Sequence, residues 1–283
     1  MSPTLTTTDH SRDIAGLKYI YPVISRRAGG LSIGVNFNTN NACNWRCVYC
    51  QVPELTIGTA PDLDFKLLED ELRFFLTNVL HGDFYQRFNI AENQRVIKDI
   101  AISGNGEPTT LQDFAKAVEL IGKIATEMGV FPQSHFVLIT NGSLVHLPRV
   151  QHGLQALKNY GGEVWFKLDS ATDQGRALIN NCAQSAETSL KNLTLSASLC
   201  PTKLQTCLFN YNEAGFSAVE QEALLSLLQI IKNDTPVTTV MLYTLARASL
   251  QPEANLLKKL SLDELSVFAA KIKALGFHVG INA

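Results

Sequence analysis

The chain has 283 residues, 46% hydrophobic and 18% charged, and its 24 lysines and arginines nearly balance 26 aspartates and glutamates. This apolar content excludes intrinsic disorder, because the chain can bury enough surface to offset the entropy of ordering. The balanced charge provides no basic field for nucleic acid. The most apolar run, residues 223–231, is about half the length of a transmembrane helix. The N-terminus lacks the order of a secretory signal, so we expect a cytoplasmic protein with no membrane partner.

Strand-like and helix-like segments alternate along the chain. Residues 1–20 are rich in threonine and serine, and we expect them to form a flexible lead-in. Hydrophobic periodicity then predicts six units, each a strand followed by a helix. Their ranges are 31–37 with 62–80, 98–103 with 109–128, 135–140 with 147–160, 163–169 with 172–199, 203–209 with 217–232, and 237–243 with 261–275. Capping sequences at Thr109, Ser217 and Ser261 mark the starts of three of these helices.

This alternation is typical of an α/β fold with a parallel sheet and right-handed crossovers. Six units in about 250 residues form either an open doubly wound sheet or a curved, incomplete barrel, and the pattern leaves both open. No break in composition separates the units, so we expect residues 21–283 to fold as one domain. In either architecture the active site lies at the C-terminal ends of the strands.

Three of the six cysteines lie close together after the first predicted strand, as Cys43, Cys47 and Cys50. A chain of this length without an export signal does not need disulfides, so the cluster indicates metal binding. Structural zinc usually pairs two C-x2-C knuckles, and a ferredoxin cluster takes four cysteines. Three thiolates on a four-iron cluster would instead leave one iron open to a substrate.

The spacing C-x3-C-x2-C, with Tyr49 before the last cysteine, resembles the signature of the radical S-adenosylmethionine (SAM) superfamily. The resemblance implies a single-domain partial (β/α)6 TIM-like barrel, with Cys43, Cys47 and Cys50 as ligands of a [4Fe-4S] cluster. In this family SAM chelates the open iron, and one electron cleaves it to methionine and a 5′-deoxyadenosyl radical that abstracts hydrogen from the substrate. The electron would come from an external donor such as a flavodoxin or ferredoxin.

A glycine-rich stretch after the second strand, Gly104-Asn105-Gly106-Glu107-Pro108, resembles the family motif that accepts hydrogen bonds from the SAM amino group. Glycines let a backbone approach closely, and a carboxylate such as Glu107 is a charged acceptor for an ammonium. An ordinary turn between strand and helix is the competing interpretation.

The resemblance assigns further contacts with SAM to the ends of later strands. These positions are Tyr49, Asn141 with its neighbours Thr140 and Gly142, Lys167, Asp169, Ser170, Arg247 and Gln205. Lys167 and Asp169 alternate along one strand and so face the same side of the sheet. The competing interpretations are a turn at Asn141, a structural ion pair between Lys167 and Asp169, and a solvated loop charge at Arg247.

Within the superfamily the chain resembles the wyosine-synthase-like proteins. It shares with them residues 21–27, residues 31–36, the stretch at 104–108 and the sequence Tyr243-Thr-Leu-Ala-Arg247. Wyosine synthases rebuild a guanine in tRNA and carry additional segments that contact tRNA. Because this chain has a net charge of −2 and ends soon after the sixth unit, we expect a small-molecule or peptide substrate rather than tRNA.

The remaining cysteines, Cys182, Cys200 and Cys207, fit no compact ligand motif, and we interpret them as buried hydrophobic side chains. An auxiliary cluster is the alternative. Arg26 and Arg27 are interpreted as a surface pair. For the whole chain, the alternatives to an enzyme acting on a small molecule or peptide are a tRNA-modifying enzyme and a non-catalytic iron–sulfur or redox sensor.

Overall fold

The computed structural model describes residues 5, 15–25, 29–212 and 217–282. Its centre is a curled eight-stranded sheet with the order β1-β2-β5-β6-β7-β8-β10-β12. The strands are β1 (Ile20–Ser25), β2 (Gly30–Val35), β5 (Ile97–Ile102), β6 (His135–Thr140), β7 (Glu163–Lys167), β8 (Thr202–Cys207), β10 (Thr239–Tyr243) and β12 (His278–Asn282). Neighbouring strands are parallel except for β1, which pairs antiparallel with β2.

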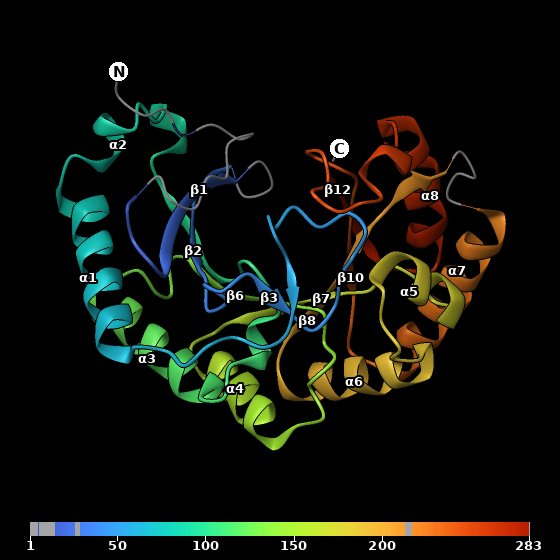
Figure 1. The fold of residues 1–283 in the computed structure, drawn as a ribbon, viewed down its shortest axis with the longest axis horizontal. Helices are drawn as coiled ribbons and strands as arrows, with labels where there is room; N and C mark the ends of the chain where they lie inside the picture. Colours follow the sequence, from blue (N-terminus) through green and yellow to red (C-terminus); the bar gives the residue numbers. More distant parts are fainter. Residues whose placement is uncertain (1–4, 6–14, 26–28, 213–216, 283) are drawn as a thin grey trace.

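The large helices form an outer layer around this sheet (Figure 1). They are α1 (Phe65–His81), α3 (Phe114–Glu127), α4 (Pro148–Asn159), α6 (Ala186–Leu199), α7 (Ala218–Asp234) and α8 (Leu262–Ala274). A doubly wound sheet reverses its strand order and carries helices on both faces. Here the strand order follows the sequence, which confirms the partial TIM-like barrel.

The core lies between the outer layer and the sheet. Helix α1 buries Leu68, Leu72 and Phe75 at helical spacing, and β5 buries Ile100 and Ile102 in the same hydrophobic cluster. Each fully buried side chain of this kind stabilises the fold by roughly 1.5–3 kcal/mol. This packing fixes the strands whose C-terminal ends carry the predicted site.

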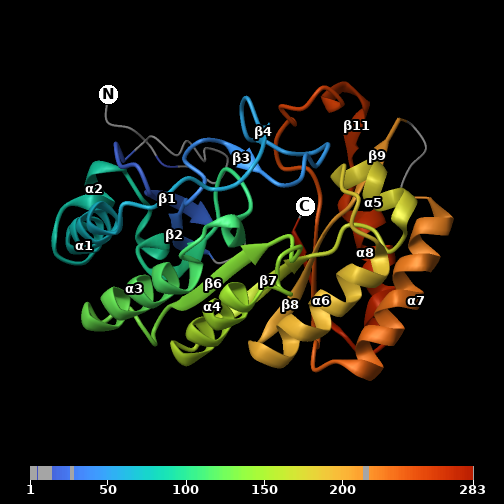
Figure 2. The ribbon, with the colours of Figure 1, turned by 60° about the horizontal axis from the view of Figure 1, so that its bottom comes forward.

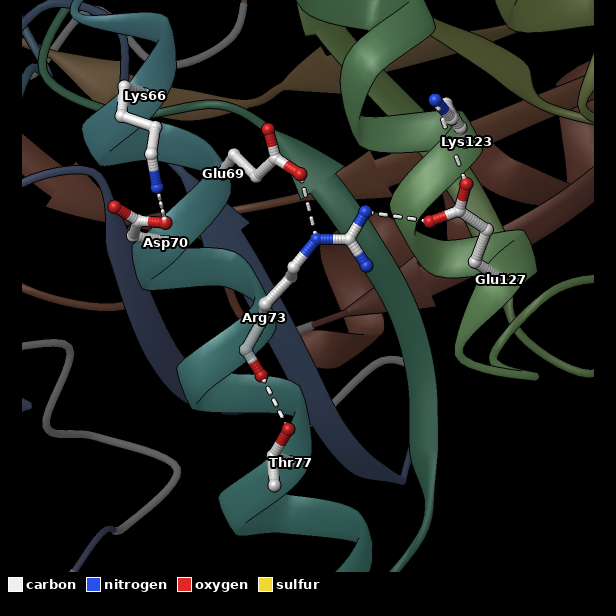
Figure 3. A network of polar contacts seen from close by, with 7 residues as sticks. All are labelled: Lys66, Glu69, Asp70, Arg73, Thr77, Lys123 and Glu127. Atoms are coloured by element: carbon white, nitrogen blue, oxygen red, sulfur yellow. Dashed lines mark hydrogen bonds and ion pairs between the residues drawn. The ribbon is translucent and has the colours of Figure 1, made fainter.

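Ion pairs tie α1 to α3 on the solvent side (Figure 3). Arg73 donates to Glu69 at 2.8 Å and to Glu127 at 2.6 Å, and Lys123 lies 3.8 Å from Glu127. The pair Lys66–Asp70 and the bond from the Thr77 hydroxyl to the Arg73 carbonyl stay within α1. Exposed pairs contribute at most about 1 kcal/mol each, so the apolar layer beneath them holds the two helices together.

Two two-stranded units lie on the side of the molecule opposite α3, α4 and α6 (Figure 2). They pair β3 (Ala42–Cys43) with β4 (Thr56–Ile57), and β9 (Phe209–Tyr211) with β11 (Leu257–Lys259). The short helical segments are α2 (Phe84–Arg87), η1 (Glu92–Gln94), η2 (Pro108–Thr110) and η3 (Ala254–Leu256). Among the helices of the described residues, none has the length and apolar character that crossing a membrane requires.

The structure refines one sequence prediction and corrects another. The helical region expected over 172–199 consists of two helices, α5 (Asp173–Asn180) and α6, because Asn181 adopts a left-handed conformation with φ 48° that ends α5. Thr109 caps no helix: it lies within η2, and Asp113 precedes α3. The caps at Ser217 and Ser261 are confirmed.

Most of residues 1–20, the expected lead-in, lies outside the described residues. Tyr19 and Ile20 are buried, and Ile20 begins β1. The backbone N–H groups of Lys18 and Tyr19 donate to the Glu71 carboxylate at 2.7 and 2.8 Å, which joins this segment to α1. Arg26 and Arg27 also lie outside the described residues.

Candidate active site

The cysteine loop runs between β2 and α1. Cys43 ends β3, whose pairing with β4 holds the start of the loop. The backbone N–H of Cys50 donates to the carbonyl of Cys47 at 2.9 Å, which forms a tight turn between the two thiols. All three cysteines are free and partly exposed. Partial exposure is unusual for a cysteine that only packs in a core.

Burial raises the pKa of the Cys43 thiol to about 11, and the charges of Glu107 and Cys50 raise it further against a hydrogen bond from the Trp45 backbone. Burial likewise raises the pKa of Cys47 to about 12, while the charge of Lys167 opposes the shift. The thiols therefore lie close enough to influence one another electrostatically. Without metal, the Cys43 and Cys47 thiols are therefore protonated at neutral pH.

The donor set of the loop fits a four-iron cluster. Three cysteines that are free of disulfides and only partly buried supply the sulfur donors that iron–sulfur clusters take. Within the described part of the chain, no group of three or more His, Cys, Asp or Glu side chains is close enough to hold a single metal ion. A cube of four irons takes one thiolate per iron, so three cysteines can hold three of its irons.

Glycines allow the loop after β5 to pack directly on the cysteine loop. A Cβ on Gly106 would lie 2.0 Å from the carbonyl oxygen of Ala42, and one on Gly104 would lie 2.2 Å from Oδ1 of Asn36. Asn105 donates through its backbone to Asn36 at 3.0 Å and through its side chain to Asn41 at 2.6 Å. The close approach expected of these glycines is therefore made to the protein's own cysteine loop.

Glu107 is buried, and protein donors surround its carboxylate. Oε1 accepts from the Thr109 backbone at 3.1 Å and from the hydroxyls of Thr109 and Thr140 at 2.6 Å each, and Oε2 accepts from the Asn141 backbone at 2.7 Å. Burial raises its pKa, and these hydrogen bonds oppose the rise. Each carboxylate oxygen can accept about two hydrogen bonds, which leaves Oε2 with capacity for one more donor.

Asn141 connects the end of β6 to the cysteine loop. Its side-chain nitrogen donates to Oδ1 of Asn44 at 2.9 Å, and Asn44 donates in turn to the Ser143 hydroxyl at 2.7 Å. Gly142 has φ 70°, and a Cβ there would overlap the Phe166 ring. The ends of β2, β5 and β6 thus form one hydrogen-bonded assembly around residues 36–44.

Lys167 and Asp169 lie together at the end of β7. Lys167 Nζ donates to the Tyr243 hydroxyl at 3.2 Å and lies 4.9 Å from the centre of the Tyr49 ring. Asp169 accepts from the Tyr49 hydroxyl at 2.5 Å and from the Cys207 backbone at 2.9 Å. Within the described residues the two charges form no direct ion pair, so the interpretation as a structural salt bridge does not hold.

Lys167 is held in its charged form. Burial lowers its pKa, but interactions with the Tyr243 hydroxyl, the Asp169 carboxylate and the sulfurs of Cys47 and Cys207 outweigh this and raise the pKa above its ordinary value. The amide of Gln205 lies beside Lys167 in the parallel register of β7 and β8 and is buried. A protonated, partly accessible lysine at this end of the sheet is suited to holding a carboxylate.

Two other predicted contacts have different surroundings. The Ser170 hydroxyl donates to Glu220 at 2.8 Å, toward the first turn of α7. Arg247 is exposed on the loop after β10, and its backbone carbonyl accepts from Gln51 at 3.2 Å. That loop also holds the cysteine loop, because the Ser249 hydroxyl donates to the carbonyls of Val48 at 2.7 Å and Cys50 at 3.1 Å.

Several residues that hold the cysteine loop were not predicted from the sequence. Arg46 forms two 2.8 Å bonds with Glu253, and Ser249 binds the loop as described above. Asn180 and Asn181, at the end of α5, contact Cys47 and Arg46. Only this asparagine pair carries a signal in the sequence, since asparagine is typical of the left-handed end of a helix.

The scattered cysteines lie apart from one another. Cys200 is at the N-terminal end of β8, where its thiol faces the Gly162 carbonyl at 3.5 Å, and Cys207 is at the opposite end of the same strand. Cys182 contacts the Arg176 carbonyl at 3.8 Å. All three are buried, which agrees with their interpretation as hydrophobic side chains. Cys207 alone lies in the small apolar cluster with Val48 and Tyr49.

Solved structures show the same fold. The chain superimposes on TYW1 with a lysine–pyruvate adduct bound, with a TM-score of 0.55, 15% identity and coverage of 87% of this chain and 74% of that one. It also superimposes on a radical SAM methyltransferase from Sphaerobacter thermophilus, with a TM-score of 0.59, 14% identity and coverage of 89% and 66%. A third match is anSMEcpe with bound AdoMet and the Cp18Cys peptide, with a TM-score of 0.55, 15% identity and coverage of 88% of this chain and 62% of that one.

A curated protein, the GTPase Obg of Brachyspira hyodysenteriae, is 27% identical over 155 residues, which are 54% of this chain. The chain spans a fifth of the length of that relative, so we infer no function from this match. The family model of the Radical SAM superfamily matches residues 37–223, which are more than half of the chain. This range contains the cysteine loop, the glycine-rich stretch and the ends of β6 and β7. The chain therefore belongs to the radical SAM superfamily, whose members are enzymes that use a [4Fe-4S] cluster and SAM.

Proposed function

We propose that this radical SAM enzyme binds its [4Fe-4S] cluster through Cys43, Cys47 and Cys50 and acts on a small molecule or a peptide. The observation that carries the proposal is a loop with three free, partly buried cysteines beside a group of buried polar side chains at the same end of the sheet. When bound and reduced, the cluster supplies the electron that cleaves SAM to methionine and a 5′-deoxyadenosyl radical. The residues 21–283 form the domain that carries this activity.

The chain's own residues are suited to holding the amino-acid part of SAM. An ammonium needs acceptors, and Glu107 Oε2 keeps capacity for one more donor beside the Asn141 amide. A carboxylate needs a cation, and the raised pKa of Lys167 keeps it protonated at neutral pH. We assign further contacts to Tyr49, Gly104, Asn105, Gly106, Asp169, Ser170 and Arg247. Of these, Ser170 has the weakest support, because Glu220 already binds its hydroxyl.

The finer assignment is to the wyosine-synthase-like group. It is supported by the sequence that the chain shares with that group at residues 21–27, 31–36, 104–108 and 243–247. We do not extend the assignment to tRNA as substrate. A protein that neutralises many phosphates carries a basic surface, and this chain has a net charge of −2. An external flavodoxin or ferredoxin would supply the electron.

The test is anaerobic reconstitution with iron and sulfide, reduction in the presence of SAM, and chromatography for 5′-deoxyadenosine and methionine. We expect both products from the native chain and neither from the variant with alanine at positions 43, 47 and 50. Product formation by that variant would refute the assignment of the ligands. A cluster that forms but neither binds nor cleaves SAM would favour a redox sensor, and a salt-sensitive complex with tRNA would favour the tRNA enzyme.

A further inference from the structure

Residues of helix α5 and its C-terminal end contact four consecutive residues of the cysteine loop. The guanidinium of buried Arg176 lies 5.2 Å from the Trp45 ring. The side chain of Asn181 donates to the Arg46 carbonyl at 2.9 Å. The carbonyl of Ile179 accepts from the Val48 backbone at 2.8 Å. These contacts leave the loop little freedom to move relative to α5.

The fourth contact between α5 and the cysteine loop involves a sulfur atom. Asn180 is 1% exposed, and its Nδ2 lies 3.3 Å from Cys47 Sγ and 2.8 Å from Asp169 Oδ2. An amide nitrogen carries two hydrogens, so it can donate to both acceptors at once. Asn180 thereby connects a thiol of the cysteine loop to the Asp169 carboxylate.

The orientation of the Asn180 amide is determined by these two acceptors. Its Oδ1 is buried and has no hydrogen-bond partner among the described residues. A flipped amide would direct this oxygen at a carboxylate and a sulfur, both electron-rich, and would lose both bonds. An unsatisfied buried carbonyl is costly and calls for a reason. The reason here is that the nitrogen must face Cys47 and Asp169.

We propose that Asn180 is a positioning residue that sets the reduction potential of the cluster, by donating an N–H···S hydrogen bond to Cys47 and by separating that ligand from the charge of Asp169. The inference rests on the proposed function of Cys47 as a ligand. Hydrogen bonds to cluster sulfurs are among the main determinants of reduction potential. They stabilise the reduced state more, because it carries the greater negative charge. Mutation of a residue that orients a metal ligand in this way typically costs roughly 10–100-fold in metal affinity or activity.

Asp169 would otherwise have the opposite effect. A carboxylate beside a thiolate ligand disfavours the added electron, and burial strengthens the repulsion. The Tyr49 hydroxyl and the Asn180 amide both donate to Oδ2, and the Cys207 backbone donates to Oδ1. Of these three donors, Asn180 also donates to Cys47. Its removal would therefore change the environment of the ligand and of the carboxylate together.

The variant Asn180→Leu keeps the approximate size of the side chain and removes both donors. The matched control is Asn181→Gly. This variant removes the neighbouring contact from Asn181 to the Arg46 carbonyl, which involves no sulfur atom. Glycine also accepts the φ of 48° at this position. If the end of α5 only restrains the position of the loop, both variants should shift the midpoint potential of the cluster equally. If the hydrogen bond to sulfur sets the potential, the two variants should differ in their midpoint potentials.

The experiment reconstitutes the native chain and both variants anaerobically, assays bound iron and sulfide, and measures the midpoint potential by a spectroscopically monitored redox titration. We expect Asn180→Leu to lower the ratio of reduced to oxidised cluster about tenfold at a fixed potential, equal to about 59 mV for one electron. We expect Asn181→Gly to leave the potential at the native value. If Asn180→Leu retains no iron, Asn180→Ala is titrated in its place with the same expectation.

Two results would overturn the inference. One is a native midpoint potential in the Asn180 variant, and the other is an equal shift in Asn181→Gly. A different result would overturn the proposed function itself, namely a native chain that assembles no four-iron cluster under conditions in which it remains folded. The iron and sulfide assay on the native chain separates that failure from the other two.

Discussion

The backbone N–H of Asn141 donates a 2.7 Å hydrogen bond to Oε2 of Glu107, which joins the end of β6 to the loop after β5. Neither residue is exposed enough for water to replace this bond. Because Asn141 also binds Asn44, the bond is one step of a continuous path from the glycine-rich stretch to the cysteine loop. Glu107 is thus a structural support of the site as well as a candidate contact for SAM.

Replacing Glu107 with glutamine should lower stability and SAM affinity together. Four donors now surround the Glu107 carboxylate, and the amide nitrogen of a glutamine cannot accept hydrogen bonds from them. A buried mismatch of this kind lowers the free energy of unfolding by about 2–3 kcal/mol. Urea denaturation measures the loss of stability, and equilibrium dialysis with SAM measures the affinity of the reconstituted protein.

Glu71→Gln is the matched control for Glu107. Glu71 is also a buried carboxylate that accepts backbone donors, but these come from Lys18 and Tyr19. We expect it to lower stability and to leave SAM affinity unchanged. Equal affinities of the native chain and Glu107→Gln would remove Glu107 from the SAM site.

Gly106→Ala should impair cluster assembly. The added Cβ would lie 2.0 Å from the Ala42 carbonyl, so the cysteine loop must move before Cys43 can take its place. Gly280→Ala is the control, since nothing lies within 4 Å of a Cβ there. We expect iron content after reconstitution to fall at least several-fold in the first variant only. Native iron content in Gly106→Ala would show that this close approach is not needed.

Lys167→Met should weaken SAM binding roughly tenfold, the effect of losing one charge-assisted hydrogen bond of about 1.5 kcal/mol. Lys203→Met is the control, because Lys203 pairs with Glu163 at 2.7 Å at the N-terminal end of the same sheet. Dialysis with radiolabelled SAM compares the two. The proposed carboxylate contact fails if both variants bind SAM equally well.

The ion pair between Arg46 and Glu253 predicts a pH dependence. The hydrogen bond from Arg46 lowers the pKa of Glu253 in the folded state, so the pair stabilises the fold above the carboxyl's ordinary pKa of 4.5. This contribution disappears as the pH falls through the lowered pKa. The pair is partly exposed, so we expect no more than about 1 kcal/mol.

Urea denaturation of the native chain and Glu253→Gln, repeated from pH 6 down to about pH 3, tests this dependence. The two stability curves should be separated at pH 6 and converge in acid. A separation that stays constant with pH would mean that Glu253 acts by packing and not by charge.

The sequence predicts the repeating core well and its edges poorly. Strand β6 matches its prediction because an apolar run between polar ends is a local signal. Strand β1 was not predicted, since it contains Pro22, which an edge strand tolerates and a central strand does not. Strand β12 is only partly buried and lacks a clear alternation. The break between α5 and α6 depends on one left-handed residue, Asn181, which periodicity does not register.

The same distinction applies to the site. Cys43, Cys47 and Cys50 are recognisable because their type and spacing are visible within eight residues. Asn180 is not, because its contact with Cys47 joins residues 133 positions apart and exists only after β7 and α5 have packed. The competing interpretations of Lys167 and Asp169 could be separated only by geometry, which provides tyrosine and amide partners and no direct pair.

The most direct test of the proposed cluster site is the electron paramagnetic resonance spectrum of the reduced, reconstituted native protein, with and without SAM. Three protein thiolates leave one iron for SAM to chelate, so we predict a four-iron signal whose g-values change when SAM is added. A four-iron signal that SAM leaves unaltered, or no such signal in a folded native protein, would contradict this prediction.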